Sequence, residues 1–276
     1  MPVSRLSAAF ANAAAEGRAA FVAYVMSGDP DAATTGAILD ALVAAGTDVI
    51  ELGFPFTDPM ADGPAIQAAG LRALKAGTTL TSTLETAAAF RARHPDTALI
   101  VMGYLNPVES MGYQAFAQRA AEAGVDGAII VDVPPEEAAD LAGAMDAADL
   151  ALIRLATPTT DAARLPAVVK GVRGFVYFVS VAGITGDKAI ETAGIEQMVA
   201  SVRAASHLPV AVGFGIRTPE AAARTARIAD GVVVGSAIVD QIAAAHDGGQ
   251  DPAAAAGAFA AELAAAVRTA RQGPAH

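Results

Sequence analysis

The chain has no cysteine and only four histidines in 276 residues. Without cysteine it has no disulfide, no thiolate nucleophile and no metal site built on cysteine. No two of the histidines stand at the spacing of metal ligands; they are His94, His207, His246 and His276. Catalysis by histidine or cysteine is therefore disfavoured, no metal site is predicted, and carboxylates, tyrosines and backbone amides remain for chemistry.

Basic residues are also scarce, with 18 Lys and Arg against 29 Asp and Glu, a formal net charge of -11 and a pI near 4.7. Nucleic-acid binding depends on clustered Lys and Arg, so no nucleic-acid partner is expected. The acidic residues are spread along the chain, which indicates a solvated surface rather than an acidic tail. With 54% hydrophobic and 17% charged residues, the chain is expected to fold around a sizeable core.

Long apolar runs are missing as well. The Ala-rich run 253–269 is interrupted by Glu262 and Arg268, so no membrane span is predicted. The first 21 residues contain Asn12 and Glu16 and lack a Leu-rich centre, which argues against a signal peptide. A cytoplasmic protein is expected, beginning with a helix over residues 1–18 that carries Leu6 on its apolar face together with Phe10.

Short apolar runs of strand length recur between Ala-rich helical stretches. Most of these runs are continuous rather than alternating, as parallel strands covered on both faces are. They are Ala20–Val25, Asp48–Leu52, Ala98–Met102, Gly127–Val131, Ala151–Leu155, Gly174–Val179, Val210–Val212 and Gly231–Val234. Helices are expected between them, for example over Asp31–Ala45, Thr81–Arg93, Tyr113–Ala123, Pro135–Ala147, Ile195–Ala204 and Pro219–Arg227.

Eight strand–helix units in this length predict a single (β/α)₈ barrel, also called a TIM barrel, over residues 1–276 with a frayed tail at 272–276. A doubly wound open sheet is the competing layout, but the G-x-G-x-x-G turn typical of that fold is absent after the first strand. In a barrel, active-site residues lie at the carboxyl ends of the strands and in the loops that follow.

Glu51 is the most informative residue of this kind, because it interrupts the apolar strand Val49-Ile50-Glu51-Leu52. Side chains alternate across a strand, so Glu51 shares a face with Val49, and one face of every barrel strand is interior. A buried carboxylate is costly unless it is held in a hydrogen-bond network or has a function. The functional interpretation is a general acid and base whose pKa is raised by an apolar pocket.

The loop after Glu51 carries two more carboxylates, Asp58 and Asp62, between three prolines. Each aspartate could simply cap a turn. The proline spacing nevertheless favours a fixed path that sets a second carboxylate opposite the first, and two carboxylates in different environments can divide acid and base roles.

Glycines follow the sixth, seventh and eighth strands, in 182–186, 213–216 and Gly235-Ser236. Glycine lets backbone amides approach an anion, and barrel phosphate sites commonly use the loops after strands seven and eight. A phosphorylated substrate is therefore predicted. Aromatic residues also stand at strand ends, and of these Phe214, between two glycines, is the one expected to stack on a ligand ring; the others are Tyr24, Tyr104 and Tyr177.

Taken together, these motifs closely resemble the tryptophan synthase α subunits over nearly the whole chain. The segment ELGFPFTDPMADGP at 51–64 is the most specific, because it sets Glu and Asp in a fixed relation to three prolines. The other motifs follow in family order: SGDP at 27–30, MGYLNPV at 102–108, DVPPEE at 132–137, TPTT at 157–160, GITG at 183–186, GFGI at 213–216 and GSAIV at 235–239.

The resemblance implies a lyase that splits indole-3-glycerol phosphate into indole and glyceraldehyde 3-phosphate. In this interpretation Glu51 is the general acid and base, and Asp62 binds the indole N–H. Substrate contacts are implied for Tyr177, Phe214, Tyr104 and the lid residue Thr185, and phosphate contacts for Gly186, Gly215, Gly235 and Ser236.

The resemblance also implies a partner. Asp58 and its loop would face a β subunit in an α₂β₂ heterotetramer, and indole would pass to the pyridoxal phosphate held there, with no cofactor in this chain. Two positions depart from some members of the family: Val181 replaces an arginine of the lid, and Tyr24 replaces a phenylalanine. The first leaves the lid contacts open, and the second either adds a hydroxyl near the indole or only repacks.

Other phosphate-binding barrels fit the residues less well. An indole-3-glycerol phosphate synthase places a lysine at a strand end, whereas none of Lys75, Lys170 and Lys188 lies in a predicted strand. A thiamine phosphate synthase needs more acidic ligands for pyrophosphate and Mg²⁺. An activating subunit with little turnover of its own is the alternative from another class, and the presence of both Glu51 and Asp62 argues against it.

Overall fold

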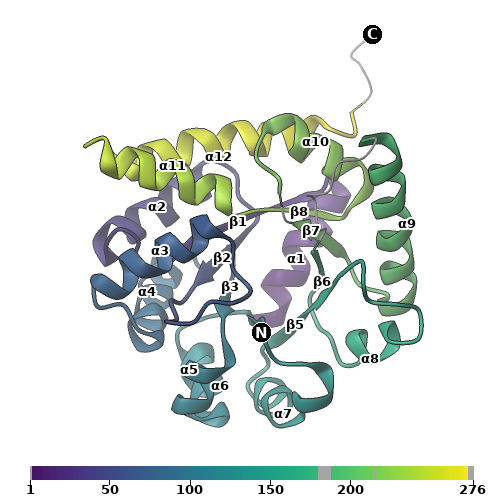
Figure 1. Cartoon of the computed structure of the whole chain (residues 1–276), viewed down its shortest axis with the longest axis horizontal. Helices are drawn as coiled ribbons and strands as arrows, with labels where there is room; N and C mark the ends of the chain where they lie inside the picture. Colours follow the sequence, from purple (N-terminus) through teal and green to yellow (C-terminus); the bar gives the residue numbers. More distant parts are fainter. Residues whose placement is uncertain (1, 180–187, 214, 273–276) are drawn as a thin grey trace.

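In the computed structural model, which describes residues 2–179, 188–213 and 215–272, eight parallel strands close into a barrel (Figure 1). Each strand pairs with the next along the chain, and β8 pairs with β1. The strands are β1 (Ala20–Met26), β2 (Val49–Gly53), β3 (Ala98–Gly103), β4 (Gly127–Ile130), β5 (Ala151–Ala156), β6 (Val176–Val179), β7 (Val210–Gly213) and β8 (Gly231–Val234). The (β/α)₈ barrel predicted from the apolar runs is confirmed.

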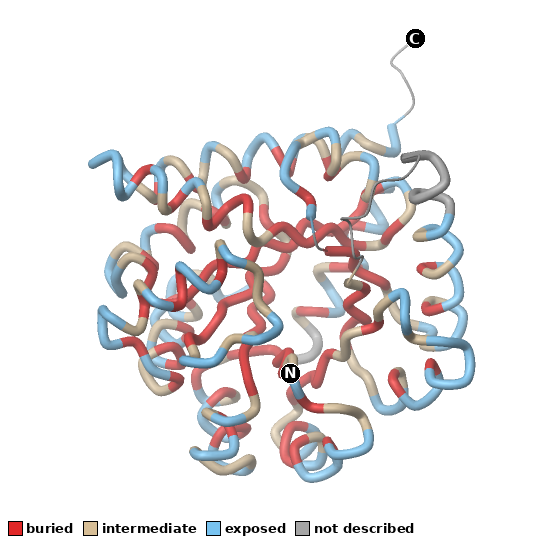
Figure 2. Tube along the Cα trace, viewed as in Figure 1, coloured by how far each residue is buried: buried red, intermediate tan, exposed pale blue. Residues whose placement is uncertain are grey.

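Helices surround the ring of strands, and buried residues follow the strands while exposed ones lie on the outer helix faces (Figures 1 and 2). They are α2 (Ala32–Ala44), α3 (Pro64–Lys75), α4 (Leu80–Arg93), α5 (Leu105–Met111), α6 (Tyr113–Glu122), the 3₁₀ helix η1 (Pro135–Glu137), α7 (Ala139–Ala147), α8 (Leu165–Val169), α9 (Lys188–Ser206), α10 (Pro219–Ile228), α11 (Ser236–Asp247) and α12 (Pro252–Thr269). Within the described part of the chain, no helix has the length and apolar character needed to cross a membrane.

Helix α1 (Pro2–Ala15) closes the barrel at the amino ends of the strands. Its buried Leu6 and Phe10 pack against interior strand residues, and the ring of Phe10 lies 5.1 Å from that of Phe175. The helix expected over residues 1–18 ends at Ala15, and Gly17 follows with a φ of 70° that ordinary side chains rarely adopt. One end of the barrel is therefore filled by apolar side chains.

Aspartates at this same end join neighbouring strands. An Asp directly precedes β2, β4 and β8, and its carboxylate accepts a hydrogen bond from a backbone amide of the preceding strand or its flank. The pairs are Asp48 with Phe21 N at 2.8 Å, Asp126 with Leu99 N at 2.7 Å, and Asp230 with Val210 N at 2.9 Å. Each carboxylate also pairs with an arginine, respectively Arg18, Arg91 and Arg203. The amino ends of these strands are thus tied together by charge as well as by the sheet.

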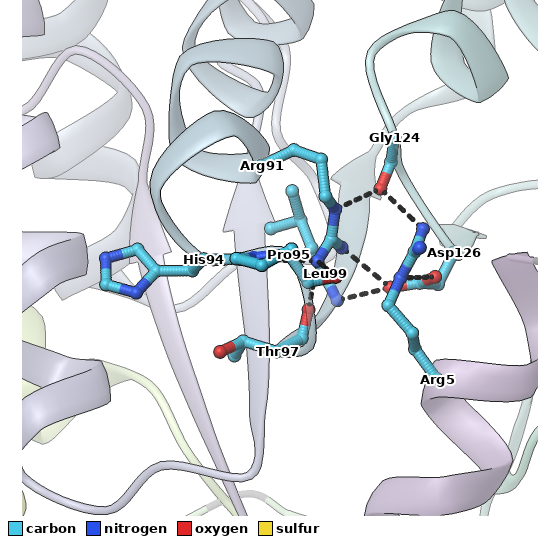
Figure 3. Close-up of polar contacts among 8 residues, drawn as sticks. All are labelled: Arg5, Arg91, His94, Pro95, Thr97, Leu99, Gly124 and Asp126. Carbon is cyan, nitrogen blue, oxygen red and sulfur yellow. Dashed lines mark hydrogen bonds and ion pairs between the residues drawn. The ribbon is translucent and has the colours of Figure 1, made fainter.

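The most buried of these aspartates is Asp126, which has no exposed surface. Figure 3 shows the hydrogen bonds and ion pairs around it. Arg5 of α1 donates to Asp126 Oδ1 at 2.8 Å, and Arg91 of α4 donates to Oδ2 at 3.0 Å. Both arginines also donate to the carbonyl of Gly124. This network fastens α1 and α4 to the strands β3 and β4.

Several predicted elements differ from the structure by more than one residue. The helix predicted over Ile195–Ala204, for example, runs from Lys188 to Ser206. The sixth strand begins at Val176 rather than Gly174, because Gly174 has a φ of 80° and a Cβ there would lie 2.5 Å from Leu6 Cδ2. The helix predicted over 135–147 is interrupted at Ala138, which has φ -89° and ψ 4°. Ala138 is completely buried, so the chain turns there to place its methyl group in the core.

Candidate active site

A cavity of about 400 Å³ opens at the carboxyl ends of the strands, the end opposite α1. Its described lining residues are Tyr24, Glu51, Ala61, Asp62, Gly63, Pro64, Ile66, Met102, Val131, Leu155, Thr157, Tyr177, Val179, Gly215, Ile216, Arg217, Val233, Gly235 and Ser236. Most of these side chains are apolar and a few are polar or charged, which is typical of a site for a small molecule with an aromatic or aliphatic part.

Glu51 lies at the base of this cavity, on the interior face of β2 between Tyr24 of β1 and Ile100 of β3. The residue is 1% exposed, and its Oε2 has no hydrogen-bond partner among the described residues. Burial, with a smaller contribution from the negative charge of Asp62, raises the pKa of Glu51 to about 8. Near neutral pH a large share of this carboxyl group is therefore protonated and able to donate a proton.

Asp62 lies across the cavity from β2, in the loop that leads to α3. The loop is held in place because Asp62 N donates to Pro59 O at 3.1 Å and the Gln67 side chain donates to Asp62 O at 2.9 Å. Partial burial raises the pKa of Asp62 to about 6, and the nearby Tyr104 hydroxyl acts in the opposite direction. The two carboxyl groups thus share one cavity with different proton affinities, as acid and base roles require.

Tyr104 lies beside the cavity, next to Asp62. It is not among the described residues that line the cavity; its hydroxyl accepts a hydrogen bond from Ala61 N at 2.9 Å. Its ring lies 5.3 Å from that of Phe56. Tyr104 therefore supports the loop that carries Asp62.

Two buried tyrosines, Tyr24 and Tyr177, do line the cavity. Burial raises the pKa of both, and the negative charge of Glu51 adds to this effect at Tyr177. Each ring covers a glycine of the next strand: a Cβ at Gly53 would lie 2.3 Å from Tyr24 Oη, and one at Gly213 would lie 2.3 Å from Tyr177 Oη. Glycine at these two positions makes room for a phenol on either side of Glu51.

The predicted phosphate residues Gly215, Gly235 and Ser236 line the same cavity. Gly215 has a φ of 74°, which favours glycine, and Gly235 is the N-cap of α11 without a side-chain cap bond. The first amides of α11 therefore lie at the cavity rim, where a helix N-terminus favours an anion. The predicted residues Phe214, Thr185 and Gly186, together with Val181, lie outside the described residues.

Asp58 does not line the cavity but lies on the exposed outer side of the loop, where it accepts a hydrogen bond from Thr57 Oγ1 at 2.5 Å. Met60 beside it is 86% exposed.

Arg217 is a lining residue that the sequence interpretation missed, although it directly follows the GFGI motif. Helix α3 was not among the helices named from the sequence, although Gly63-Pro64 is a recognisable helix start.

A sequence model of the family described as tryptophan synthase alpha chain matches residues 10–268 of this chain. The chain belongs to the tryptophan synthase alpha chain family. Its similarity to named members is high: it is 60% identical over 273 residues to the tryptophan synthase alpha chain of Rhizorhabdus wittichii, covering 98% of both chains. It is 57% identical over 273 residues to that of Caulobacter vibrioides, covering 99% of both.

Solved structures of this family have the same fold. Tryptophan synthase subunit alpha from Legionella pneumophila superposes with a TM-score of 0.89 at 39% identity, over 95% of this chain and 98% of that one. A tryptophan synthase structure from M. tuberculosis, in an open form, gives a TM-score of 0.86 at 37% identity over 96% and 98%. Tryptophan synthase alpha chains are lyases of tryptophan biosynthesis, and membership of the family implies a β-subunit partner.

Proposed function

We propose that this chain cleaves indole-3-glycerol phosphate into indole and D-glyceraldehyde 3-phosphate, the α reaction of tryptophan synthase. The observation that carries the proposal is Glu51, a buried carboxyl group in the cavity whose Oε2 has no described partner and whose pKa is about 8. Family membership supplies the reaction class, and the cavity supplies the acid and base that this reaction needs.

The reaction is a retro-aldol cleavage. Glu51 in its protonated form donates its proton to C3 of the indole ring, which leaves a positive charge spread over the ring toward its nitrogen. The resulting carboxylate then accepts the proton of the hydroxyl on the adjacent glycerol carbon. The bond between indole C3 and this glycerol carbon then breaks. The glycerol carbon becomes the aldehyde carbon, and the electron pair of the broken bond restores the neutral indole ring. Glu51 ends protonated, ready for the next turnover.

Asp62 is proposed to accept a hydrogen bond from the indole N–H and to stabilise the positive charge on the ring. It lines the same cavity as Glu51, and its loop is held by Tyr104 and Gln67. Tyr177 is proposed to position Glu51 and the substrate, in keeping with its place in the cavity wall. The stacking role of Phe214 and the lid role of Thr185 are proposed from the family resemblance alone.

The phosphate of the substrate is proposed to bind at the rim formed by Gly215, Gly235 and Ser236, with Gly186 as a further contact from the family resemblance. The amino end of α11 favours negative charge at this rim. A phosphate there sets the glycerol chain pointing inward, toward Glu51. We further propose an α₂β₂ heterotetramer in which the loop with Asp58 faces the β subunit, and pyridoxal phosphate is held by that subunit.

Indole release from indole-3-glycerol phosphate tests the proposal, with wild type, Glu51→Gln and the control Glu85→Gln, each with and without a β subunit. Glu85 is a good control because it is exposed on α4. We expect wild type and Glu85→Gln to release indole, and Glu51→Gln to be nearly inactive. Retained activity in Glu51→Gln would refute its acid–base role, and an inactive wild type with its β subunit would refute the reaction.

A further inference from the structure

Arg217 is a cation at the rim of a cavity whose other charged lining residues are acidic. Among the described residues that line this cavity, Arg217 is the only Lys or Arg, and Glu51 and Asp62 are the only acids. It follows Gly215 by two positions and shares the rim with Gly235 and Ser236. A phosphate bound at these glycines therefore has one described cation within the same lining.

The backbone on both sides of Arg217 has a defined conformation, and its side chain is largely exposed. Gly215 before it holds a left-handed turn, and Thr218 after it is the N-cap of α10, accepting from Ala221 N at 3.3 Å. The Arg217 side chain is 58% exposed, and its guanidinium pairs with Asp240 of α11, itself 41% exposed. An arginine so placed can change partner without moving the backbone.

The pair with Asp240 is a weak anchor for this arginine. Exposed ion pairs contribute little to stability, because water competes for both charges and two long side chains must be ordered. A phosphate dianion offers the guanidinium a higher charge and several acceptor oxygens in the geometry that suits two parallel N–H donors. When both acceptors are within reach, phosphate is the stronger of the two.

We propose that Arg217 binds the phosphate group of the substrate, exchanging Asp240 for phosphate when the ligand enters. The proposal rests on the proposed function for the identity of the substrate, but the binding of a phosphate ester can be measured without turnover. Asp240 holds the guanidinium at the rim in the free protein and competes with the ligand for it. Arg217 acts on binding rather than on bond cleavage, so its loss raises KM more than it lowers kcat.

Calorimetric titration with glycerol 3-phosphate tests this, using wild type, Arg217→Gln, Arg217→Lys and Asp240→Asn. Because a hydrogen bond to a charged group is stronger than a neutral one, we expect Arg217→Gln to weaken binding about tenfold or more. Arg217→Lys keeps the charge and should lose less. Asp240→Asn removes the competing negative charge and should bind at least as tightly as wild type.

A purely structural ion pair gives a different pattern, in which Arg217→Gln and Asp240→Asn weaken binding equally and lower the melting temperature equally. That result, or wild-type affinity in Arg217→Gln, overturns the proposal. Indole, which lacks phosphate, serves as the control ligand, and its affinity should be the same in all four proteins. If glycerol 3-phosphate behaves as expected while indole-3-glycerol phosphate is not cleaved, the proposed reaction fails and the role of Arg217 stands.

Discussion

Asp126 and Glu51 are both buried carboxylates of one barrel, yet their surroundings are opposite. Asp126, at the end closed by α1, accepts hydrogen bonds from Arg5, Arg91 and the amide of Leu99. Glu51, at the end with the cavity, has one oxygen with no described partner. Burial raises the pKa of both groups, but only at Asp126 do two guanidiniums and an amide oppose it. Asp126 is thus a buried carboxylate paired for the structure, whereas Glu51 is the buried carboxylate to which the proposed function assigns the chemistry.

This contrast teaches how to tell the two kinds of residue apart. A buried carboxylate with all its partners binds distant segments together, whereas one without them costs stability that only a ligand or a reaction can justify. We call the end of the barrel with the cavity and Glu51 the chemical end, and the end closed by α1 with Asp126 the structural end.

The largest effect is expected at the chemical end. Glu51→Gln should lower indole release by about a hundred- to ten-thousandfold, the range for a lost general acid and base. The same variant should be no less stable than wild type at pH 8, since a neutral amide replaces a buried charge. Activity and urea denaturation measured on one preparation check this. A marked loss of stability would mean that the Glu51 carboxyl group stabilises the fold, as that of Asp126 does.

At the structural end, Asp126→Asn should lower the free energy of unfolding by about 3 kcal/mol, because it leaves two arginines without their buried partner. The kcat of the folded fraction should stay near that of wild type, since Asp126 lies at the end of the barrel opposite the cavity. Urea denaturation and turnover at low temperature measure the two quantities. A large fall in kcat with intact folding would contradict the interpretation that Asp126 acts on stability alone.

The stability of the fold should depend on pH through Glu51. The pKa of Glu51 is about 8 in the folded chain against 4.5 when unperturbed, so the folded state holds its proton more tightly. The stability that this proton provides is complete below about pH 4.5 and is lost as pH rises to about 8. Relative to Glu51→Gln, wild type should therefore lose melting temperature over this window and level off above it. A constant difference would mean that Glu51 is ionised in the folded state throughout.

Tyr104→Phe should have a smaller effect. The change removes the acceptor of the Ala61 amide, at a cost of about 1 kcal/mol, and removes the hydroxyl that lowers the pKa of Asp62. The acidic limb of the kcat/KM profile should then shift above pH 6, where Asp62 titrates in the wild-type chain. An unchanged profile would show that Tyr104 does not act through Asp62.

The smallest effect is expected for an exposed pair. Arg164 and Glu136 pair at 3.2 Å with about half of each side chain exposed, at 49% and 55%. Glu136→Gln should change the free energy of unfolding by at most about 0.5 kcal/mol, because exposed pairs are screened by water and salt. Urea denaturation of Glu136→Gln and Asp126→Asn in parallel compares the loss of unfolding free energy at an exposed and at a buried ion pair. Equal losses would mean that burial makes no difference to the contribution of the pair.

Much of this arrangement could be predicted from the sequence because it depends on local patterns. The alternation in Val49–Leu52 predicted that Glu51 shares a face with Val49, the functional interpretation set that face in an apolar pocket, and Gly235-Ser236 marked the start of a helix after a strand. Contacts between distant segments could not be predicted in this way. The support of Ala61 by Tyr104 joins residues 43 positions apart, and the tie of Arg5 to Asp126 spans 121.

The aspartates that precede β2, β4 and β8 have a consequence for how this protein can change. Each carboxylate joins its own strand to a given amide of the preceding strand, so the register of the sheet is set at the end opposite the cavity. Loops at the opposite end can then vary in sequence while the strands keep their alignment. Libraries randomised in the loops after β2, β7 and β8 should therefore give many folded members, and new substrates could be selected from them without rebuilding the barrel.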